Sequence, residues 1–140
     1  MITLSEWQQQ GLFEQINGQQ IFTRQAGSKQ APVLLLIHGY PSASWDWEGM
    51  WHTLTQHYNV ITLDMLGFGL SDKPKDALYL ISQQADIFQA FLHKLGVSEY
   101  HILAHDYGDT VAQELLARQV DDNSHMHIAS VCFFKWWLIS

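Results

Sequence analysis

The chain is 140 residues long, and 7 basic against 14 acidic side chains give it a formal charge of −7. Apolar residues make up 47% of the sequence and charged residues 15%, which excludes a disordered chain and favours one domain with a packed core. The acidic excess argues against a nucleic-acid partner. No transmembrane segment is expected, because no apolar run is longer than Val33 to Ile37. A single cysteine, Cys132, and a start without signal-peptide features favour a cytoplasmic protein.

The first predicted element is a β-hairpin. Residues 11–16 and 19–25 have strand character and flank Asn17-Gly18, the strongest two-residue hairpin signal. Further along, apolar runs of strand length alternate with amphipathic stretches, and the residues from 33 to 37 are apolar at every position, as in a strand covered on both faces. The predicted strands after the hairpin are Val33 to Ile37, Tyr58 to Asp64, Tyr100 to His105, and Ile128 to Phe134.

Three helices are predicted between these strands. The first contains apolar residues at helical spacing from Trp47 to Leu54, with Ser44 placed to cap its start. The second runs from Ile81 to Leu95 and is stopped by Gly96. The third covers residues 110–119. Strands that alternate with helices indicate right-handed crossovers, so the predicted fold is an antiparallel hairpin leading into a mainly parallel α/β sheet with helices on both faces.

Ligands of open α/β sheets bind beyond the carboxyl ends of the strands, where three segments of this chain carry unusual residues. They are the segments HGYP at 38–41, DMLGFGLSD at 64–72 and AHDYGD at 104–109. The third has the small-x-nucleophile-x-small pattern of a nucleophile elbow, with Ala104 and Gly108 around a central Asp106. The two small residues allow the strand and the following helix to approach closely.

An aspartate at this position favours a particular chemistry. The carboxylate of Asp106 is ionised near neutral pH and can attack a saturated carbon without a base, forming an ester with the substrate. Hydrolysis of that ester needs an activated water, usually from a histidine, and an oxyanion hole. We expect the backbone N–H groups of Tyr107 and Tyr40 to be the oxyanion donors, because Gly39 permits a tight bend and Pro41 keeps Tyr40 extended.

Each of these residues also has a structural interpretation. Asp106 alone is typical of a helix N-cap, and His38 alone of a hydrogen-bonded structural histidine. The glycines of segment 64–72 alone would form turns, and as a dinucleotide fingerprint that segment fails at Asp72. The pair His125 and His127 has metal-ligand spacing, but no cluster completes a site, so neither a metal nor another cofactor is predicted. The coincidence of three motifs, each at the end of a strand, favours the catalytic interpretation.

The three segments together resemble the α/β-hydrolase superfamily, in the aspartate-nucleophile branch that contains epoxide hydrolases and haloalkane dehalogenases. Residues 38–41 are similar to the HGxP oxyanion motif of that branch, and residues 64–74 to its D-x-x-G-x-G-x-S-D-K-P loop. Residues 105–116 are especially similar to mesoderm-specific transcript-like hydrolases. The similarity extends from about Gly11 to Cys132.

This resemblance implies that Asp106 is the nucleophile and that the N–H groups of Tyr40 and Tyr107 form the oxyanion hole. The supporting residues are then His38, Gly39, Pro41, His105 and Gly108. Dehalogenases of this branch commonly have a tryptophan after the nucleophile and an asparagine in the oxyanion loop. Tyrosines occupy both places here, which favours an epoxide hydrolase-like enzyme acting on a small apolar or electrophilic organic substrate. The alternatives are a haloalkane dehalogenase-like hydrolase, an ester or lactone hydrolase on the same scaffold, and a non-catalytic binding protein.

The family's fold continues beyond the last predicted strand with a cap domain, further strands, an acid and a catalytic histidine. We therefore expect residues 1–132 to be the N-terminal part of an α/β-hydrolase domain, truncated after about the sixth strand and unable to complete turnover. His125 and His127 precede that strand at the wrong edge of the sheet to serve Asp106. Residues 133–140 are interpreted as an aberrant tail produced by a one-nucleotide frameshift. If Phe-Phe-Lys-Trp-Trp is encoded as TTT-TTT-AAA-TGG-TGG, removing one T gives Phe-Leu-Asn-Gly-Gly, which is closer to what the family resemblance implies at the end of this strand.

Overall fold

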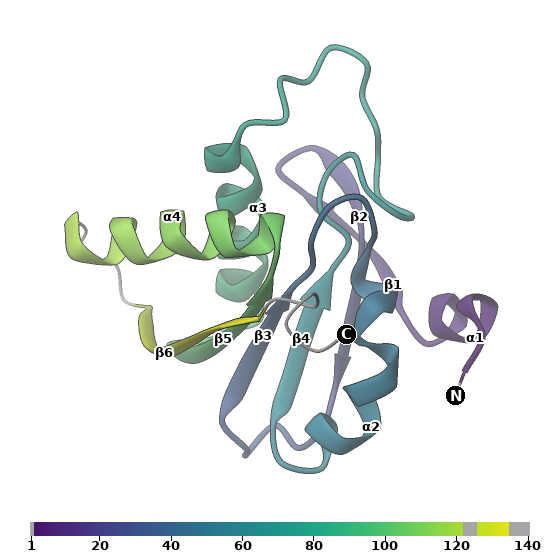
Figure 1. Cartoon of the computed structure of the whole chain (residues 1–140), viewed down its shortest axis with the longest axis vertical. Coiled ribbons are helices and arrows are strands. Elements are labelled where there is room, and N and C mark those ends of the chain that lie inside the picture. Colours follow the sequence, from purple (N-terminus) through teal and green to yellow (C-terminus); the bar gives the residue numbers. More distant parts are fainter. Residues whose placement is uncertain (1, 122–125, 135–140) are drawn as a thin grey trace.

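The computed structural model describes residues 2–121 and 126–134, which form a six-stranded sheet flanked by helices (Figure 1). The helices are α1 (Leu4–Gln9), α2 (Glu48–Thr55), α3 (Ile81–Lys94) and α4 (Tyr107–Asp121), and a 3₁₀ turn, η1 (Ser44–Trp47), precedes α2. The strands are β1 (Leu12–Ile16), β2 (Gln19–Ala26), β3 (Val33–Ile37), β4 (Asn59–Leu63), β5 (Glu99–His105) and β6 (His127–Phe134).

The strand order is β1-β2-β4-β3-β5-β6, and it confirms the predicted combination of a hairpin with a parallel sheet. β1 and β2 pair antiparallel around Asn17 and Gly18, whose φ angles of 51° and 80° are the left-handed values that a tight hairpin turn needs. β2 pairs antiparallel with β4, whereas β4, β3, β5 and β6 run parallel. The carboxyl ends of these four strands therefore lie at one edge of the sheet.

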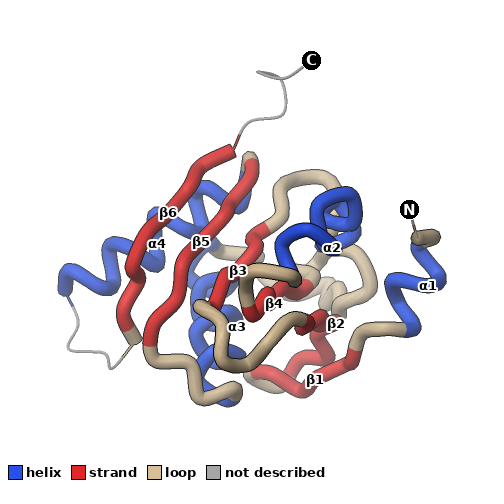
Figure 2. The backbone as a smooth tube through the Cα atoms, turned by 90° about the horizontal axis from the view of Figure 1, so that it is seen from below, coloured by secondary structure: helices blue, strands red, loops and turns tan. Residues whose placement is uncertain are grey.

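The crossovers explain why helices cover both faces of the sheet. The chain steps from β3 to β4 in one direction, then crosses back over β3 to reach β5 and continues outward to β6. Right-handed crossovers in opposite directions place their helices on opposite faces. Accordingly, α2 lies on one face while α3 and α4 lie on the other (Figure 2).

Each face of the sheet has its own apolar core. The larger core packs α3 and α4 against the sheet and includes Phe88, Ile102 and Val111. The smaller core lies under α1 and α2 and is rich in aromatic residues, with Trp7, Trp47 and Trp51 among its members. Both cores share strand β3, whose side chains alternate between them.

The predicted helices differ from the observed ones at their starts. α4 begins at Tyr107 rather than at residue 110, because a single residue, Asp106, turns the chain from β5 into the helix. The prediction that Ser44 caps the first helix is wrong: Ser44 lies inside η1, and its hydroxyl accepts a hydrogen bond from Trp7 Nε1 at 3.3 Å. The predicted stop of α3 is confirmed, with Gly96 in a left-handed conformation at φ 73°.

Helix α1 was not predicted, although the sequence contains its signal. Thr3 caps the helix through its hydroxyl, which accepts from the N–H of Glu6, while the Glu6 carboxylate accepts from the N–H of Thr3. This reciprocal capping box makes a helix of only six residues possible. Trp7 on α1 is 1% exposed, so packing against the smaller core holds the helix in place.

The last described strand reaches into the segment interpreted as an aberrant tail. Phe133 and Phe134 complete β6 and lie opposite Ala104 and His105 of β5. The rest of that segment, residues 135–140, lies outside the described residues, as does His125 of the histidine pair. No helix among the described residues has both the length and the apolar character needed to cross a bilayer.

Candidate functional site

The segments at 38–41, 64–72 and 104–109 meet at the carboxyl edge of the parallel strands. Phe68, in the second segment, contacts the other two through its ring. The ring centroid of Phe68 lies 5.2 Å from that of His38, 6.1 Å from that of Tyr40 and 5.8 Å from that of Tyr107. An aromatic cluster therefore surrounds the turn that carries Asp106.

Asp106 forms the turn between β5 and α4 by itself. Its φ of 55° is a left-handed value, which costs roughly 1–2 kcal/mol for a residue with a Cβ atom. The backbone carbonyl of Asp106 accepts from the N–H of Asp109 at 2.9 Å, which starts the helix. The side chain is exposed, and no described residue donates a hydrogen bond to its carboxylate. The carboxylate thus projects from a strained turn with its oxygens available.

Two glycines allow the backbone to pack tightly around this turn. A Cβ atom on Gly39 would lie 2.6 Å from Cβ of Asp106 and 2.9 Å from the carbonyl oxygen of His105. A Cβ atom on Gly108 would lie 2.6 Å from the carbonyl oxygen of His38. All three distances are shorter than real contacts of a Cβ atom, so the close approach of the two loops depends on glycine at both positions.

The two tyrosines predicted to donate backbone N–H groups lie on either side of Asp106. Tyr107 is the first residue of α4, so its N–H has no acceptor within the helix. Tyr40 follows Gly39 in the adjoining loop; its side chain is exposed, and its peptide bond to Pro41 is cis. Burial raises the pKa of the Tyr107 hydroxyl above its ordinary value.

His38 is fully buried and links the loop at 38–41 to the segment at 64–72 through its hydrogen bonds. Its Nε2 accepts from the N–H of Met65 at 3.0 Å, so Nδ1 carries the proton and donates to the carbonyl oxygen of Gly39 at 2.8 Å. Burial lowers the pKa of His38 and favours this neutral form. Both ring nitrogens are occupied, so His38 positions the loop at 38–41 and has no free nitrogen to act as a base.

His105 precedes Asp106 and lies beside an open cavity of about 500 Å³. Its ring is 6.0 Å from that of Phe134, and burial lowers its pKa, while the negative charges of Asp106 and Asp46 act in the opposite direction. The other residues that line this cavity are Tyr40, Pro41, Ser42, Trp45, Asp46 and Glu48.

Asp64 opens the segment at 64–72 and holds it together. It is 2% exposed, and its two carboxylate oxygens accept from the N–H groups of Ser44 and Leu70, both at 2.8 Å. Gly69 packs so closely against this carboxylate that a Cβ atom there would overlap it. Ser71 accepts from the N–H of Phe22 at 2.9 Å and donates to the carbonyl oxygen of Asp64 at 2.6 Å.

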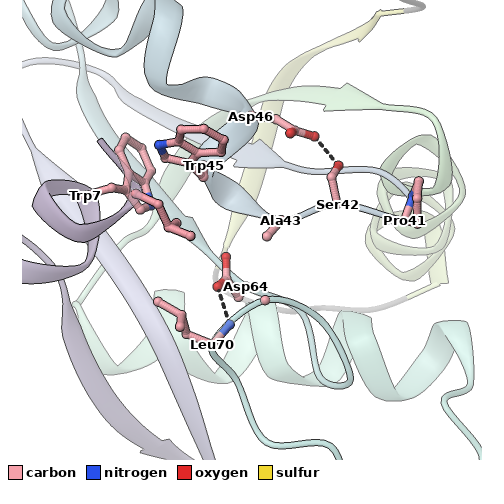
Figure 3. Close-up of a pocket in the computed structure, with 10 residues that line it drawn as sticks. Trp7, Pro41, Ser42, Ala43, Trp45, Asp46, Asp64 and Leu70 are labelled. Carbon is pink, nitrogen blue, oxygen red and sulfur yellow. Dashed lines mark hydrogen bonds between the residues drawn. The ribbon is translucent and has the colours of Figure 1, made fainter. Parts of the chain in front are cut away.

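A second cavity, of about 310 Å³, lies between the loop after β3, helix α1 and the segment at 64–72 (Figure 3). Trp7 and Trp45 form its aromatic side, and Ser42 donates a hydrogen bond to Asp46 at its edge. The sequence patterns could not reveal this cavity, because one of its walls comes from the unpredicted helix α1. Among the residues that the structure describes, no three histidine, cysteine or acidic side chains gather as a metal site.

Comparison with known proteins identifies the class. Residues 32–132 match the family model described as alpha/beta hydrolase fold, and the chain belongs to this family. The mesoderm-specific transcript homolog protein of Bos taurus is 44% identical over 135 residues, which are 92% of this chain and 40% of that protein. A haloalkane dehalogenase of Bradyrhizobium diazoefficiens is 33% identical over 104 residues, 74% of this chain and 33% of that protein.

Among solved structures, the crystal structure of a haloalkane dehalogenase, the DbeA-M1 loop variant from Bradyrhizobium elkanii, superposes with a TM-score of 0.77 at 28% identity. The match covers 88% of this chain and 39% of that one. These comparisons confirm the predicted family and fold. The chain spans about 40% of the length of the first curated relatives that it matches.

Proposed function

We propose that this chain is the nucleophile-bearing part of a hydrolase that attacks small electrophilic organic compounds through Asp106. The observation that carries the proposal is the conformation of Asp106: an exposed carboxylate at φ 55°, alone in the turn between β5 and α4. Strained residues persist where the surrounding structure holds them, and they cluster at active sites. Membership of the α/β-hydrolase fold family supports the same assignment.

The proposed first step is a displacement at carbon. One carboxylate oxygen of Asp106 attacks an epoxide carbon, the carbon–oxygen bond of the ring breaks, and the released oxygen takes a proton from solvent water, leaving a hydroxide. The product is an ester between Asp106 and the substrate. Because no described residue donates a hydrogen bond to the Asp106 carboxylate, its lone pairs are available for this attack.

The proposed second step is hydrolysis of that ester at its carbonyl carbon. Water adds, an oxyanion develops on the former carboxylate, and collapse of the intermediate releases a diol and regenerates Asp106. The N–H of Tyr107 at the start of α4 and the N–H of Tyr40 are the proposed oxyanion donors. His38 cannot activate the water, since both of its nitrogens are engaged. We assign the activating base to a part of the full-length fold that the described residues do not include.

A haloalkane dehalogenase-like reaction is the second candidate, and the relatives support it. In that reaction the same carboxylate displaces a halide rather than an epoxide oxygen. Tyr107 and Tyr40 replace the tryptophan and asparagine that are common in dehalogenases of this branch, so the epoxide hydrolase-like reaction is the first proposal.

The experiment is to trap the ester. The chain is incubated with styrene oxide or, separately, with 1-iodobutane, and its intact mass and peptide map are recorded. We expect one added group on Asp106 and a stronger response to the epoxide. Asp106→Asn should show no adduct, while Asp121→Asn, which removes an exposed carboxylate at the end of the same helix, should react like the unchanged chain.

Adduct formation that survives Asp106→Asn would contradict the proposal. A folded chain that gives no adduct with either reagent would favour the non-catalytic binding protein. Modification by 1-iodobutane alone, with release of one equivalent of iodide, would favour the dehalogenase-like reaction.

A further inference from the structure

The cavity of about 310 Å³ between the loop after β3, helix α1 and the segment at 64–72 has no part in the proposed function. Asp106 does not line it, so a ligand bound there is independent of the proposed nucleophile. Its wall is mostly apolar and includes Leu4 and Trp7 of α1, Trp45 of η1, and Leu70. Pockets for small organic molecules have this composition, and the volume suits a compact one.

The two tryptophans of this wall, both drawn in Figure 3, have different surroundings. Trp7 is 1% exposed, its Nε1 donates to Ser44, and the guanidinium carbon of Arg24 lies 4.1 Å from its ring centroid. Trp45 is 40% exposed, and among the described residues no aromatic ring stacks on its indole and no cation lies over it. The face of Trp45 is therefore available to a ligand, whereas Trp7 contributes a fixed apolar wall.

The charged side chains that line this cavity are acidic. Asp46 and Asp64 are both part of the lining, and within the described part of the chain no lysine, arginine or histidine is. Each oxygen of the buried Asp64 already accepts a backbone N–H. Asp46 is half-buried, and Ser42 donates to its Oδ2, while no donor from the described residues reaches its Oδ1. Asp46 therefore retains a carboxylate oxygen for a ligand.

The nearest cations are engaged outside the lining. Lys73 donates to the carbonyl oxygens of Gly69 and Ser71, and its side chain does not line the cavity. Arg24 is 3% exposed and does not line the cavity either, because it packs on the ring of Trp7 away from solvent. A charged group that enters the cavity therefore meets carboxylates rather than cations.

We propose that this cavity binds a small arylalkylammonium ion, which is a protonated primary amine on a short chain that carries one aromatic ring. The ammonium group contacts the carboxylate of Asp46 and the face of Trp45, and the ligand's ring packs against Trp7, Leu4 and Leu70. An indole face attracts a cation, and a carboxylate accepts a charge-assisted hydrogen bond from it. An anion of the same shape is repelled by the two carboxylates.

The test compares ligands of similar shape and different charge, namely 2-phenylethylamine, 2-phenylethanol and 3-phenylpropionate. Each is titrated calorimetrically into the full chain at neutral pH, where the amine is protonated. We expect saturable binding of the amine and at least about tenfold weaker binding of the alcohol, because the charge-assisted hydrogen bond and the cation–π contact are lost. The propionate should give no measurable binding. Equal affinities for the amine and the alcohol would overturn the proposal.

Two substitutions test whether the amine binds in this cavity. Asp46→Asn removes the charge but keeps an oxygen that accepts from Ser42, and it should weaken binding of 2-phenylethylamine about tenfold. Trp45→Leu removes the aromatic face at an exposed position and should weaken binding about two- to fivefold. Melting curves establish that each variant is folded.

Asp121→Asn is the matched control, because it removes the same charge at the end of α4, outside the lining of the cavity. It should bind 2-phenylethylamine like the unchanged chain. Equal weakening by Asp46→Asn and Asp121→Asn would overturn the proposal, since the attraction would then come from the net negative charge of the chain. Undiminished binding to folded Trp45→Leu would also overturn it.

Discussion

Asp64 and Asp106 both follow a parallel strand at the same edge of the sheet, yet their surroundings are opposite. Asp64 is buried, and each of its carboxylate oxygens accepts a backbone N–H at 2.8 Å. Asp106 is exposed, has a left-handed backbone and receives no hydrogen bond at its carboxylate from the described residues. The first aspartate holds the loops together, and the second adopts its conformation at a cost in backbone energy, which is consistent with its proposed role as the nucleophile.

The largest effect should come from removing the buried aspartate. Asp64→Ala leaves the N–H groups of Ser44 and Leu70 without acceptors, and a hydrogen bond to a charged group contributes about 1.5–3 kcal/mol. We expect a loss of about 3–6 kcal/mol in the free energy of unfolding, measured by urea denaturation. Asp106→Asn should change it by less than about 0.5 kcal/mol. Similar losses in the two variants would show that both carboxylates contribute equally to the stability of the fold.

The glycines around Asp106 should be the next most sensitive positions. Gly39→Ala and Gly108→Ala force the two loops apart, because no space for a Cβ atom exists at either position. We expect each to lower the free energy of unfolding by about 1–3 kcal/mol and to reduce adduct formation at Asp106. Gly49→Ala is the control: nothing lies within 4 Å of its Cβ position on α2, so it should stabilise the chain. If Gly49→Ala also destabilised the chain, clashes of the added Cβ atom could not explain the losses at Gly39 and Gly108.

His38 links the segments that carry the two aspartates, and its burial should make stability depend on pH. Burial lowers the pKa of His38 in the folded state. Below about pH 6.5 this histidine is therefore protonated in the unfolded chain but still neutral in the folded chain. The contribution of neutral His38 to the free energy of unfolding is therefore fully present above that pH. It falls on acidification, by up to about 1.4 kcal/mol per pH unit. In urea titrations between pH 7 and pH 5, His38→Gln should flatten this dependence. An unchanged slope would assign it to other groups.

The smallest effect should appear at Asp106 itself. Asp106→Gly relieves the left-handed strain, whereas Asp106→Ala retains it. We expect the glycine variant to be about 0.5–1 kcal/mol more stable than the alanine variant, since relief of strain is partly offset by the greater freedom of glycine in the unfolded chain. Neither variant should form an adduct with styrene oxide. Equal stability of the two would indicate that the turn is not strained.

Most of the fold could be predicted because local patterns and tertiary packing agree in the sheet. The apolar run at 33–37 coincides with β3, and the Asn17-Gly18 turn lies where the hairpin requires left-handed backbone. Two local predictions failed, one because a tertiary contact sets the role of the residue and one because the helix is short. Ser44 has the chemistry of a helix cap, but its hydroxyl is used by Trp7, a residue far away in the sequence. The six-residue α1 is too short for a periodic pattern to reveal it.

The candidate site could be located from the sequence, but the sequence did not show which of its polar residues are structural. The positions of the motifs predict that Gly39 and Asp106 lie at the same edge of the sheet, and the structure places these two residues against each other. Whether a histidine or an aspartate is structural depends on which backbone amides point at it. That pairing is visible for His38 and Asp64 only in three dimensions. The burial of Arg24 gave no sequence signal either, because it depends on indoles from two other helices.

The segment at 64–72 extends the sheet beyond the last residue of β4. Asp72 donates its N–H to the carbonyl oxygen of Gln20 at 2.9 Å, and the Ser71 hydroxyl accepts from Phe22. One half of β2 therefore pairs with the strand β4, and the other half forms hydrogen bonds with the loop at 64–72. These hydrogen bonds join the antiparallel hairpin to the parallel part of the sheet. Separating the hairpin from the parallel strands therefore requires breaking these hydrogen bonds as well as the pairing of β2 with β4.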